Sequence, residues 1–228
     1  MANQDQWCFS WIAQKPGEEG ATRAALLKGA KWPKGSIISV SFMDGDASVQ
    51  QRVADVAGRW VAPGMANLQL VFQESNDSLI RISFKERGSW SVLGTGCENV
   101  TDLSKPTMNY GWLTPESTDE DLQRVVLHEF GHALGLIHEH QNPAGGIQWN
   151  RDAVIRDLSG PPNEWDLEKI EHNMFKPVAA GEANSTTVDP DSIMMYPLPA
   201  KWTLDGFSAG LNSDLSERDK DFIRAQYD

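Results

Sequence analysis

Residues 126–138 read Val-Leu-His-Glu-Phe-Gly-His-Ala-Leu-Gly-Leu-Ile-His, and the rest of the chain is organised around this stretch. In a helix, residues four positions apart lie on one face, so His128 and His132 direct two imidazoles toward one point. Glu129 lies next to that face, where its carboxylate can act on a bound group without being a ligand itself. The spacing therefore predicts a helix that presents two histidines and an acid-base group to a common site.

The end of the motif brings a third histidine toward the first two. Gly135 can adopt a positive φ and end the helix, which lets His138 approach from another direction. Three neutral imidazoles around one point, with a fourth position open, describe a catalytic zinc site. The alternative is that the histidines only pack or cap a helix, but the glycine and the third histidine at fixed offsets make a chance match rare. We therefore interpret the motif as a site for one zinc ion.

The motif resembles the zinc signature of the metzincin metallopeptidases, which also carry a methionine turn downstream. Residues 192–196 (Ser-Ile-Met-Met-Tyr) match this turn and are called the Met-turn below. The chain is most similar to the astacin-like branch, because Glu139 follows the third histidine and Tyr196 lies two residues after Met194. One departure is Met195, where astacins commonly have histidine; we expect little consequence, since this position is not a ligand.

The resemblance implies a zinc-dependent endopeptidase. Glu129 would accept a proton from a zinc-bound water as it attacks a peptide carbonyl, and would pass the proton to the leaving nitrogen. In the family the tyrosine is a movable zinc ligand, so Tyr196 would be a fourth metal ligand and then a second donor to the oxyanion. Met194 would form an apolar floor beneath the imidazoles, and Glu139 would have a structural role.

Apolar alternation predicts strands over residues 36–43, 68–72 and 80–84, and a further strand over 107–113. Apolar residues at helical spacing predict a core-facing helix over residues 47–60. Ser117 and Glu120 have the spacing of a capping box at the start of the zinc helix, and Ser216 opens a final helix that runs through Tyr227.

The resemblance implies an α+β metzincin-like fold. We expect a mixed, mostly parallel sheet with an antiparallel edge strand, two long helices above the cleft, and a smaller, loop-rich lower subdomain with the C-terminal helix. One catalytic domain is expected over 1–228, with an upper subdomain of about 1–138 and a lower one of about 139–228.

The segment Trp90, Ser91, Val92 and Leu93 is short, flanked by glycines and polar at alternate positions, and the resemblance implies that it is the edge strand above the cleft. An exposed strand edge carries unpaired backbone groups with which an extended peptide can pair. The resemblance therefore implies that this segment binds substrate. The alternative is that it is only a connecting strand.

The composition excludes several classes of partner. The chain has 228 residues, 40% of them hydrophobic, and a formal net charge of −12. Nucleic acid and anionic membranes attract basic proteins, so neither is expected to bind. We expect a monomer that acts on a polypeptide substrate. The resemblance implies a secreted, extracellular protein, but no signal peptide is visible in the sequence, so a cytoplasmic location is the alternative.

Two cysteines and two acidic turns leave alternatives open. Cys8 and Cys97 could form one disulfide or remain two thiols, and a Cys8 thiolate could instead occupy the open zinc position. The turns at residues 44–46 and 189–191 (Asp-Gly-Asp and Asp-Pro-Asp) could hold calcium, but no twelve-residue calcium loop supports this.

Two other functional classes compete with the peptidase. A zinc-binding interaction module without proteolysis is one, but such a module has no need of the base that Glu129 provides. The other is a different zincin class in which Glu168 or Glu171 is the third ligand, although His138 makes this ligand unnecessary. His140 and His172 are read as non-ligands, because three histidines plus tyrosine or water complete the set.

Overall fold

The computed structural model describes residues 29–75, 77–142, 145–161, 163–176 and 187–228, together with the backbone of residues 8–11. Six strands form one sheet in the order β1-β5-β6-β4-β2-β3. Their bounds are Cys8–Trp11 for β1, Ile37–Phe42 for β2, Gln69–Phe72 for β3, Ile80–Ser83 for β4, Ser89–Val92 for β5 and Met108–Tyr110 for β6.

The sheet is mixed and mostly parallel. β2 pairs in parallel with β3 and β4, and β4 pairs in parallel with β6. β5 runs antiparallel to β6, at the edge of the five strands that follow β1 in the chain. These observations confirm the predicted fold class and its antiparallel edge strand. The short N-terminal strand β1 adds to the sheet beyond β5 and runs parallel to it, with Cys8 opposite Ser89 and Trp11 opposite Val92.

The α-helices are α1 (Ala47–Ala57), α2 (Asp119–Ala133), α3 (Arg151–Ser159), α4 (Leu167–Ile170) and α5 (Glu217–Tyr227). A π-helical turn, Glu171–Phe175, extends α4, and short 3₁₀ turns cover Gly58–Val61, Gly94–Asn99, Glu139–Gln141 and Ala200–Trp202. Among the described residues, no helix combines the length and the apolar character that a membrane crossing requires.

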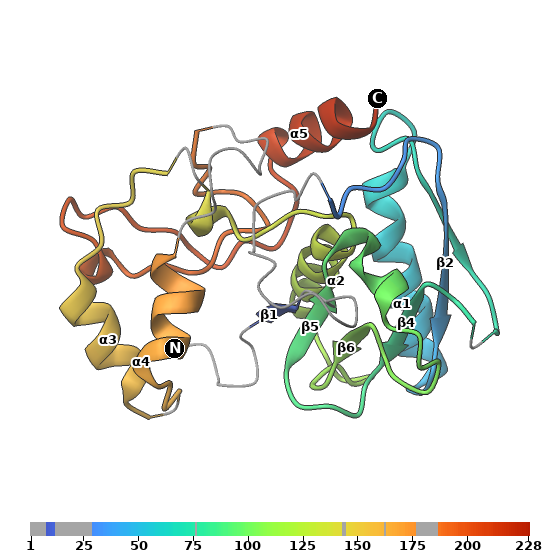
Figure 1. Cartoon of the computed structure of the whole chain (residues 1–228), viewed down its shortest axis with the longest axis horizontal. Coiled ribbons are helices and arrows are strands. Elements are labelled where there is room, and N and C mark those ends of the chain that lie inside the picture. The colour runs from blue at the N-terminus through green and yellow to red at the C-terminus, as the bar shows by residue number, and fades with distance from the viewer. Residues whose placement is uncertain (1–7, 12–28, 76, 143–144, 162, 177–186) are drawn as a thin grey trace.

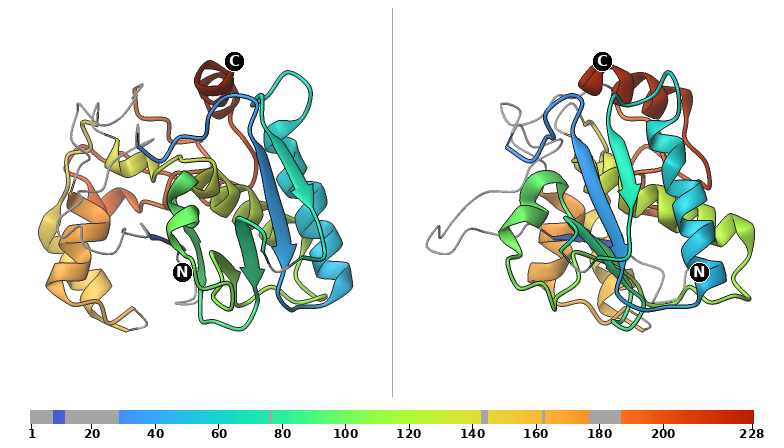
Figure 2. Two further views of the ribbon diagram at one scale, coloured as in Figure 1. Left: turned by 45° about the vertical axis from the view of Figure 1, so that its right-hand side comes forward. Right: turned by 90° about the vertical axis from the view of Figure 1, so that its right-hand side faces the viewer.

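α2 crosses the centre of the molecule and carries the zinc motif. It packs against α1 and β5, and both helices lie on one face of the sheet (Figure 2). Trp60 and Trp32 donate their indole N–H groups to the carbonyls of Leu127 and Ala133, at 2.9 and 2.8 Å. The last carbonyls of a helix have no partner within the helix, so the bond from Trp32 compensates one of them. These contacts fix the position of α2 in the core.

The start of α2 corrects the predicted capping residue. The helix begins at Asp119, and its N-cap is Thr118, whose hydroxyl accepts a hydrogen bond from the Asp121 backbone N–H. Ser117 is not the cap, because its hydroxyl accepts from the Thr114 N–H in the preceding turn. The predicted cap was one residue too early. The capping box at the start of α5 is formed as expected, by Ser216 and Asp219.

A second hydrophobic cluster lies apart from the sheet. Its buried side chains come from α3, α4, the turn after α4 and residues 195–202. α3 and α4 lie at the opposite end of the molecule from β2, with α2 between them (Figure 1). Ile193, Met194 and the buried side chains of α5 belong to the main core instead. The division at residue 138 into two subdomains of one catalytic domain stays a prediction.

Candidate active site

The first two histidines of the motif lie one helical turn apart on α2. His128 and His132 are both buried, and their ring centroids are 4.8 Å apart. Glu129, between them in sequence, is completely buried on the same helix. The predicted spacing therefore brings two imidazoles together in the interior, at the place where the helix approaches its end.

The end of α2 directs the chain toward the third histidine. Gly135 has a φ of 95°, a conformation that glycine adopts without a Cβ clash. Its N–H donates to the carbonyl of His132, and the Leu136 N–H donates to that of Gly131. This pair of bonds is the Schellman motif, which satisfies helix carbonyls as the chain reverses. His138 then lies beside His132, with 3.2 Å between their Nε2 atoms.

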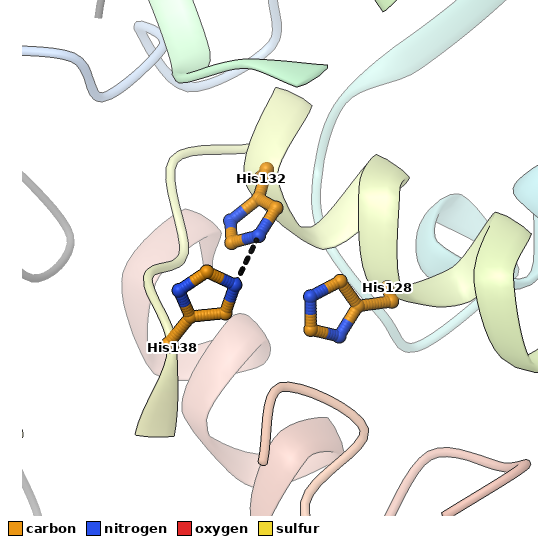
Figure 3. A group of neighbouring side chains, drawn as sticks. All are labelled: His128, His132 and His138. Atoms are coloured by element: carbon orange, nitrogen blue, oxygen red, sulfur yellow. Dashed lines mark hydrogen bonds between the residues drawn. The ribbon is translucent and has the colours of Figure 1, made fainter. Parts of the chain in front are cut away.

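The three rings converge on one point (Figure 3). His128 donates from Nδ1 to the Ile193 carbonyl, and His132 donates from Nδ1 to the Leu136 carbonyl, both at 2.7 Å. Because the proton is on Nδ1, each Nε2 carries a lone pair directed into the site. The ligand atoms of the three histidines lie within 4.8 Å of one another.

The electrostatics of the site keep all three imidazoles neutral. Burial lowers the pKa of His128 to about 4. Burial and the neighbouring imidazoles hold the pKa values of His132 and His138 well below the ordinary value. A neutral imidazole is the form that binds a metal. The Nε2 of His128 is buried without a hydrogen-bond partner, so this donor set fits a metal ion.

The Met-turn contributes Met194 and Tyr196 to the surroundings of the three histidines. Met194 is buried against α2, and a Cβ added to Gly131 would lie 2.4 Å from its Sδ. The absence of a side chain at Gly131 therefore makes room for the thioether. The Tyr196 ring is buried with its centroid 4.2 Å from that of His138 and 4.6 Å from that of His140.

Glu139 joins the segment after the third histidine to the Met-turn. Its backbone N–H donates to the Met194 carbonyl at 2.9 Å. Its carboxylate accepts from the Asn142 amide and from the Asp189 N–H. Burial raises the pKa of this carboxyl to about 7.

No protein-family model matches the sequence. Among curated proteins, mouse Tolloid-like protein 2 is 30% identical over 163 residues, which are 68% of this chain and 13% of that protein. Human Tolloid-like protein 1 is 36% identical over 104 residues, 44% of this chain and 9% of that protein. The chain thus aligns with about a tenth of the length of these relatives.

Solved structures extend the likeness over the whole chain. One structure of myroilysin has a TM-score of 0.85 and 38% identity, covering 90% of this chain and 98% of that one. The chain belongs to the astacin-like zinc metallopeptidases. High choriolytic enzyme 1, a hatching-enzyme zinc protease from the medaka Oryzias latipes, has a TM-score of 0.55 at 17% identity, covering 87% and 94%, and supports the fold.

In this zinc metalloendopeptidase the segment predicted to bind substrate overlaps β5, Ser89–Val92, and ends one residue beyond it at Leu93; its role in substrate binding stays a prediction. Ser91, Val92 and Leu93 are buried, and Trp90 is partly buried against the main core. The side of β5 that faces away from β6 pairs with β1. A peptide therefore has access to the backbone of β5 only when β1 is displaced.

The acidic turn at residues 44–46, considered above as a calcium site, forms hydrogen bonds within the protein. Asp44 accepts from Ser83 and Phe84, and Asp46 caps α1. Among the described residues, the three motif histidines are the group that could hold a metal ion, so calcium gains no support. Cys97 is a buried thiol whose pKa burial raises to about 12. The side chain of Cys8 lies outside the described residues.

Sequence reasoning missed the residues that hold the Met-turn in place. Asp219 on α5 accepts hydrogen bonds from Ser192 and Ile193, and Asn212 donates to the Ser192 carbonyl. The sequence indicated only that a helix opens at Ser216. A carboxylate that caps one helix and also binds a distant turn leaves no separate signal in the sequence.

Proposed function

We propose that this peptidase cleaves internal peptide bonds of polypeptides at a single zinc ion bound by His128, His132 and His138. The convergence of three neutral imidazoles, with the Nε2 of His128 buried and lacking a protein partner, is the observation that carries the proposal. Zinc, when bound, supplies a Lewis acid that polarises a carbonyl and makes water a nucleophile near neutral pH.

Glu129 is the proposed general base and then general acid. Its position next to His128 on α2 keeps the carboxylate beside the metal ligands while its own backbone is fixed by the helix. It accepts a proton from the attacking water and later delivers that proton to the leaving amide nitrogen. Its complete burial excludes bulk water from this transfer.

Tyr196 is the proposed fourth metal ligand in the resting site and an oxyanion donor during catalysis. Its ring packs against His138, which supports a role beside the metal: the hydroxyl would either bind the ion or donate to a developing oxyanion. His140 packs on Tyr196 and is proposed to remain a non-ligand, because its Nε2 donates to the Asn173 carbonyl at 2.7 Å.

The proposed substrate lies along Trp90, Ser91, Val92 and Leu93 as an added strand. Backbone pairing gives affinity without sequence specificity, which suits a peptidase that acts on extended chains. β1 occupies this side of β5, so productive binding requires its departure. The monomeric state, the extracellular location and the absence of nucleic-acid or membrane partners stay predictions.

Casein digestion tests the function directly. The zinc-loaded protein, after removal of residues 1–28, is expected to release peptides, and Glu129→Ala is expected to release none above background. Glu120→Ala is the matched control, because this exposed carboxylate lies on the first turn of the same helix. Equal results for wild type and Glu129→Ala, with zinc bound in both, would favour a zinc-binding module without proteolysis.

A further inference from the structure

The carboxylate of Asp219 connects the C-terminal helix to the Met-turn. It is 5% exposed and accepts hydrogen bonds from the Ser192 hydroxyl at 2.6 Å and the Ile193 N–H at 2.8 Å. Ser192 Oγ in turn accepts from the Met194 N–H at 3.0 Å. One buried carboxylate thus fixes three consecutive residues of the Met-turn, directly or through Ser192.

Ile193 carries this connection to the metal site. Its N–H is held by Asp219, and its carbonyl accepts the Nδ1–H of His128 at 2.7 Å. The carbonyl selects the tautomer of His128 and directs Nε2 toward the other two rings. A shift of the Ile193 backbone would therefore turn the imidazole.

His128 differs in this respect from His132. The Nδ1 of His132 donates to the Leu136 carbonyl, four residues away in the Schellman turn of the same helix. The partner of His128 is 65 residues away in sequence. Local helix geometry therefore orients His132, whereas the orientation of His128 depends on how the Met-turn is anchored.

Capping of α5 explains only part of the geometry of Asp219. A cap requires the reciprocal bonds with Ser216, in which Asp219 accepts from the Ser216 N–H and Ser216 Oγ accepts from the Asp219 N–H. The two bonds to the Met-turn are additional. They use both carboxylate oxygens, so the side chain is oriented toward the turn as well as toward its own helix.

We propose that Asp219 is a positioning residue for the zinc ligand His128, acting through the backbone of Ile193. The inference rests on the proposed zinc site. Outer-shell partners of metal-bound histidines typically account for 10–100-fold in metal affinity. Asp219 is one step further out: it holds the N–H of Ile193, the residue whose carbonyl is the outer-shell partner of His128.

The test compares zinc affinity and the cobalt(II) absorption spectrum of four variants with those of the wild type. Asp219→Ala leaves the Ile193 N–H without its acceptor and is expected to weaken zinc binding about 10-fold or more and to shift the cobalt spectrum. Asp219→Asn keeps an acceptor oxygen for Ile193, so its affinity is expected within about threefold of wild type with an unchanged spectrum. Wild-type behaviour of Asp219→Asn would show that the hydrogen bond to Ile193, and not the negative charge of Asp219, positions His128.

Two controls distinguish the possible failures. Ile223→Val removes one methylene from a buried side chain of α5 and lowers stability while the hydrogen bonds from Asp219 to the Met-turn stay in place, so its spectrum is expected to match wild type. His128→Ala is expected to lose the metal. Unchanged affinity and spectrum in Asp219→Ala, with metal lost in His128→Ala, would overturn this inference alone. Full metal affinity in His128→Ala would overturn the zinc site and this inference with it.

Asp219→Ser carries the test if Asp219→Ala does not fold. Serine keeps a hydroxyl near the start of α5, but its side chain is shorter than the carboxylate that accepts from the Ile193 N–H, so this bond is lost. A loss of zinc affinity of about 10-fold or more with a shifted spectrum is expected. Wild-type affinity and spectrum of Asp219→Ser would then overturn the proposal.

Discussion

The two halves of the candidate site are built in different ways. α2 contributes His128, Glu129 and His132, and its geometry follows from rules that act over four residues. The chain after α2 contributes His138, the Met-turn and Tyr196, which reach the site through contacts between segments far apart in sequence. The helix backbone of the first half is therefore specified locally, with only the ring of His128 oriented by a distant partner, whereas the second half depends on the rest of the fold being complete.

This difference has a consequence for stability and function. A change in the helical half alters one side chain and leaves its neighbours in place, because the helix backbone is fixed by Trp32 and Trp60. A substitution in the second half alters the path of the chain, because the segments of this half are kept in place by hydrogen bonds to one another. Outside the zinc ligands themselves, we expect substitutions in the first half to affect the chemistry alone, and substitutions in the second half to affect the chemistry and the metal together.

The largest effect is expected for Glu129→Gln, which tests the helical half. The amide cannot accept the proton, so kcat is expected to fall by about 10²–10⁴-fold, the usual contribution of an acid-base group. Zinc content is expected to remain at one per chain, because the three imidazoles are untouched. Steady-state kinetics and elemental analysis on one preparation measure both. Loss of zinc along with activity would contradict a purely local role.

Tyr196→Phe tests the second half. Removing the hydroxyl is expected to lower kcat about 10²-fold, as for loss of one oxyanion donor, with a smaller change in KM. Tyr227→Phe is the matched control: its hydroxyl donates to the Leu134 carbonyl, so its removal is expected to cost about 1 kcal/mol of stability with kcat unchanged. Equal kcat values for Tyr196→Phe and wild type would remove Tyr196 from the mechanism.

Removal of residues 1–28 tests whether β1 competes with substrate for β5. The shortened chain keeps Ala30, whose carbonyl accepts a hydrogen bond from the Thr95 N–H. The segment before β2 therefore stays bound to the turn that follows β5. KM for a peptide substrate is expected to fall about tenfold or more, because a tethered competitor acts at high effective concentration. An unchanged KM would mean that substrate does not pair with β5.

Gly131→Ala tests the contact between the two halves and is expected to have the smallest effect. The added Cβ meets Sδ of Met194, so the Met194 side chain must move, at a cost of about 1–3 kcal/mol. Gly58→Ala is the control, since nothing lies within 4 Å of its added Cβ and its φ is −57°. Thermal unfolding of both variants measures the difference. Equal melting temperatures for Gly131→Ala and Gly58→Ala would mean that the Met194 side chain can move away from residue 131 without cost.

The sequence predicted most of what depends on local geometry. The spacing of His128 and His132 predicted their common face, and Gly135 predicted the end of the helix. Most strands were predicted to within a few residues because apolar and polar residues alternate along them, although β4 and β6 turn out to be buried at every position. The cap was misplaced by one residue because Ser117 and Thr118 have the same capping chemistry, and only the preceding turn decides between them.

What escaped prediction depends on tertiary contacts. Asp219 meets Ile193 across 26 residues, and Gly131 accommodates Met194 across more than twice that separation in sequence. The pairing of β1 with β5 joins segments about eighty residues apart and changes the access to the edge strand. Neither periodicity nor motif spacing contains this information, because each pair is brought together only by the assembled core.

Anomalous diffraction at the zinc absorption edge, on crystals of the zinc-loaded chain, tests the central claim most directly. We predict one peak at about 2.0–2.1 Å from the Nε2 atoms of His128, His132 and His138. The absence of a peak at this point, or a peak there with one of the three rings turned away and another residue as ligand, would contradict the account.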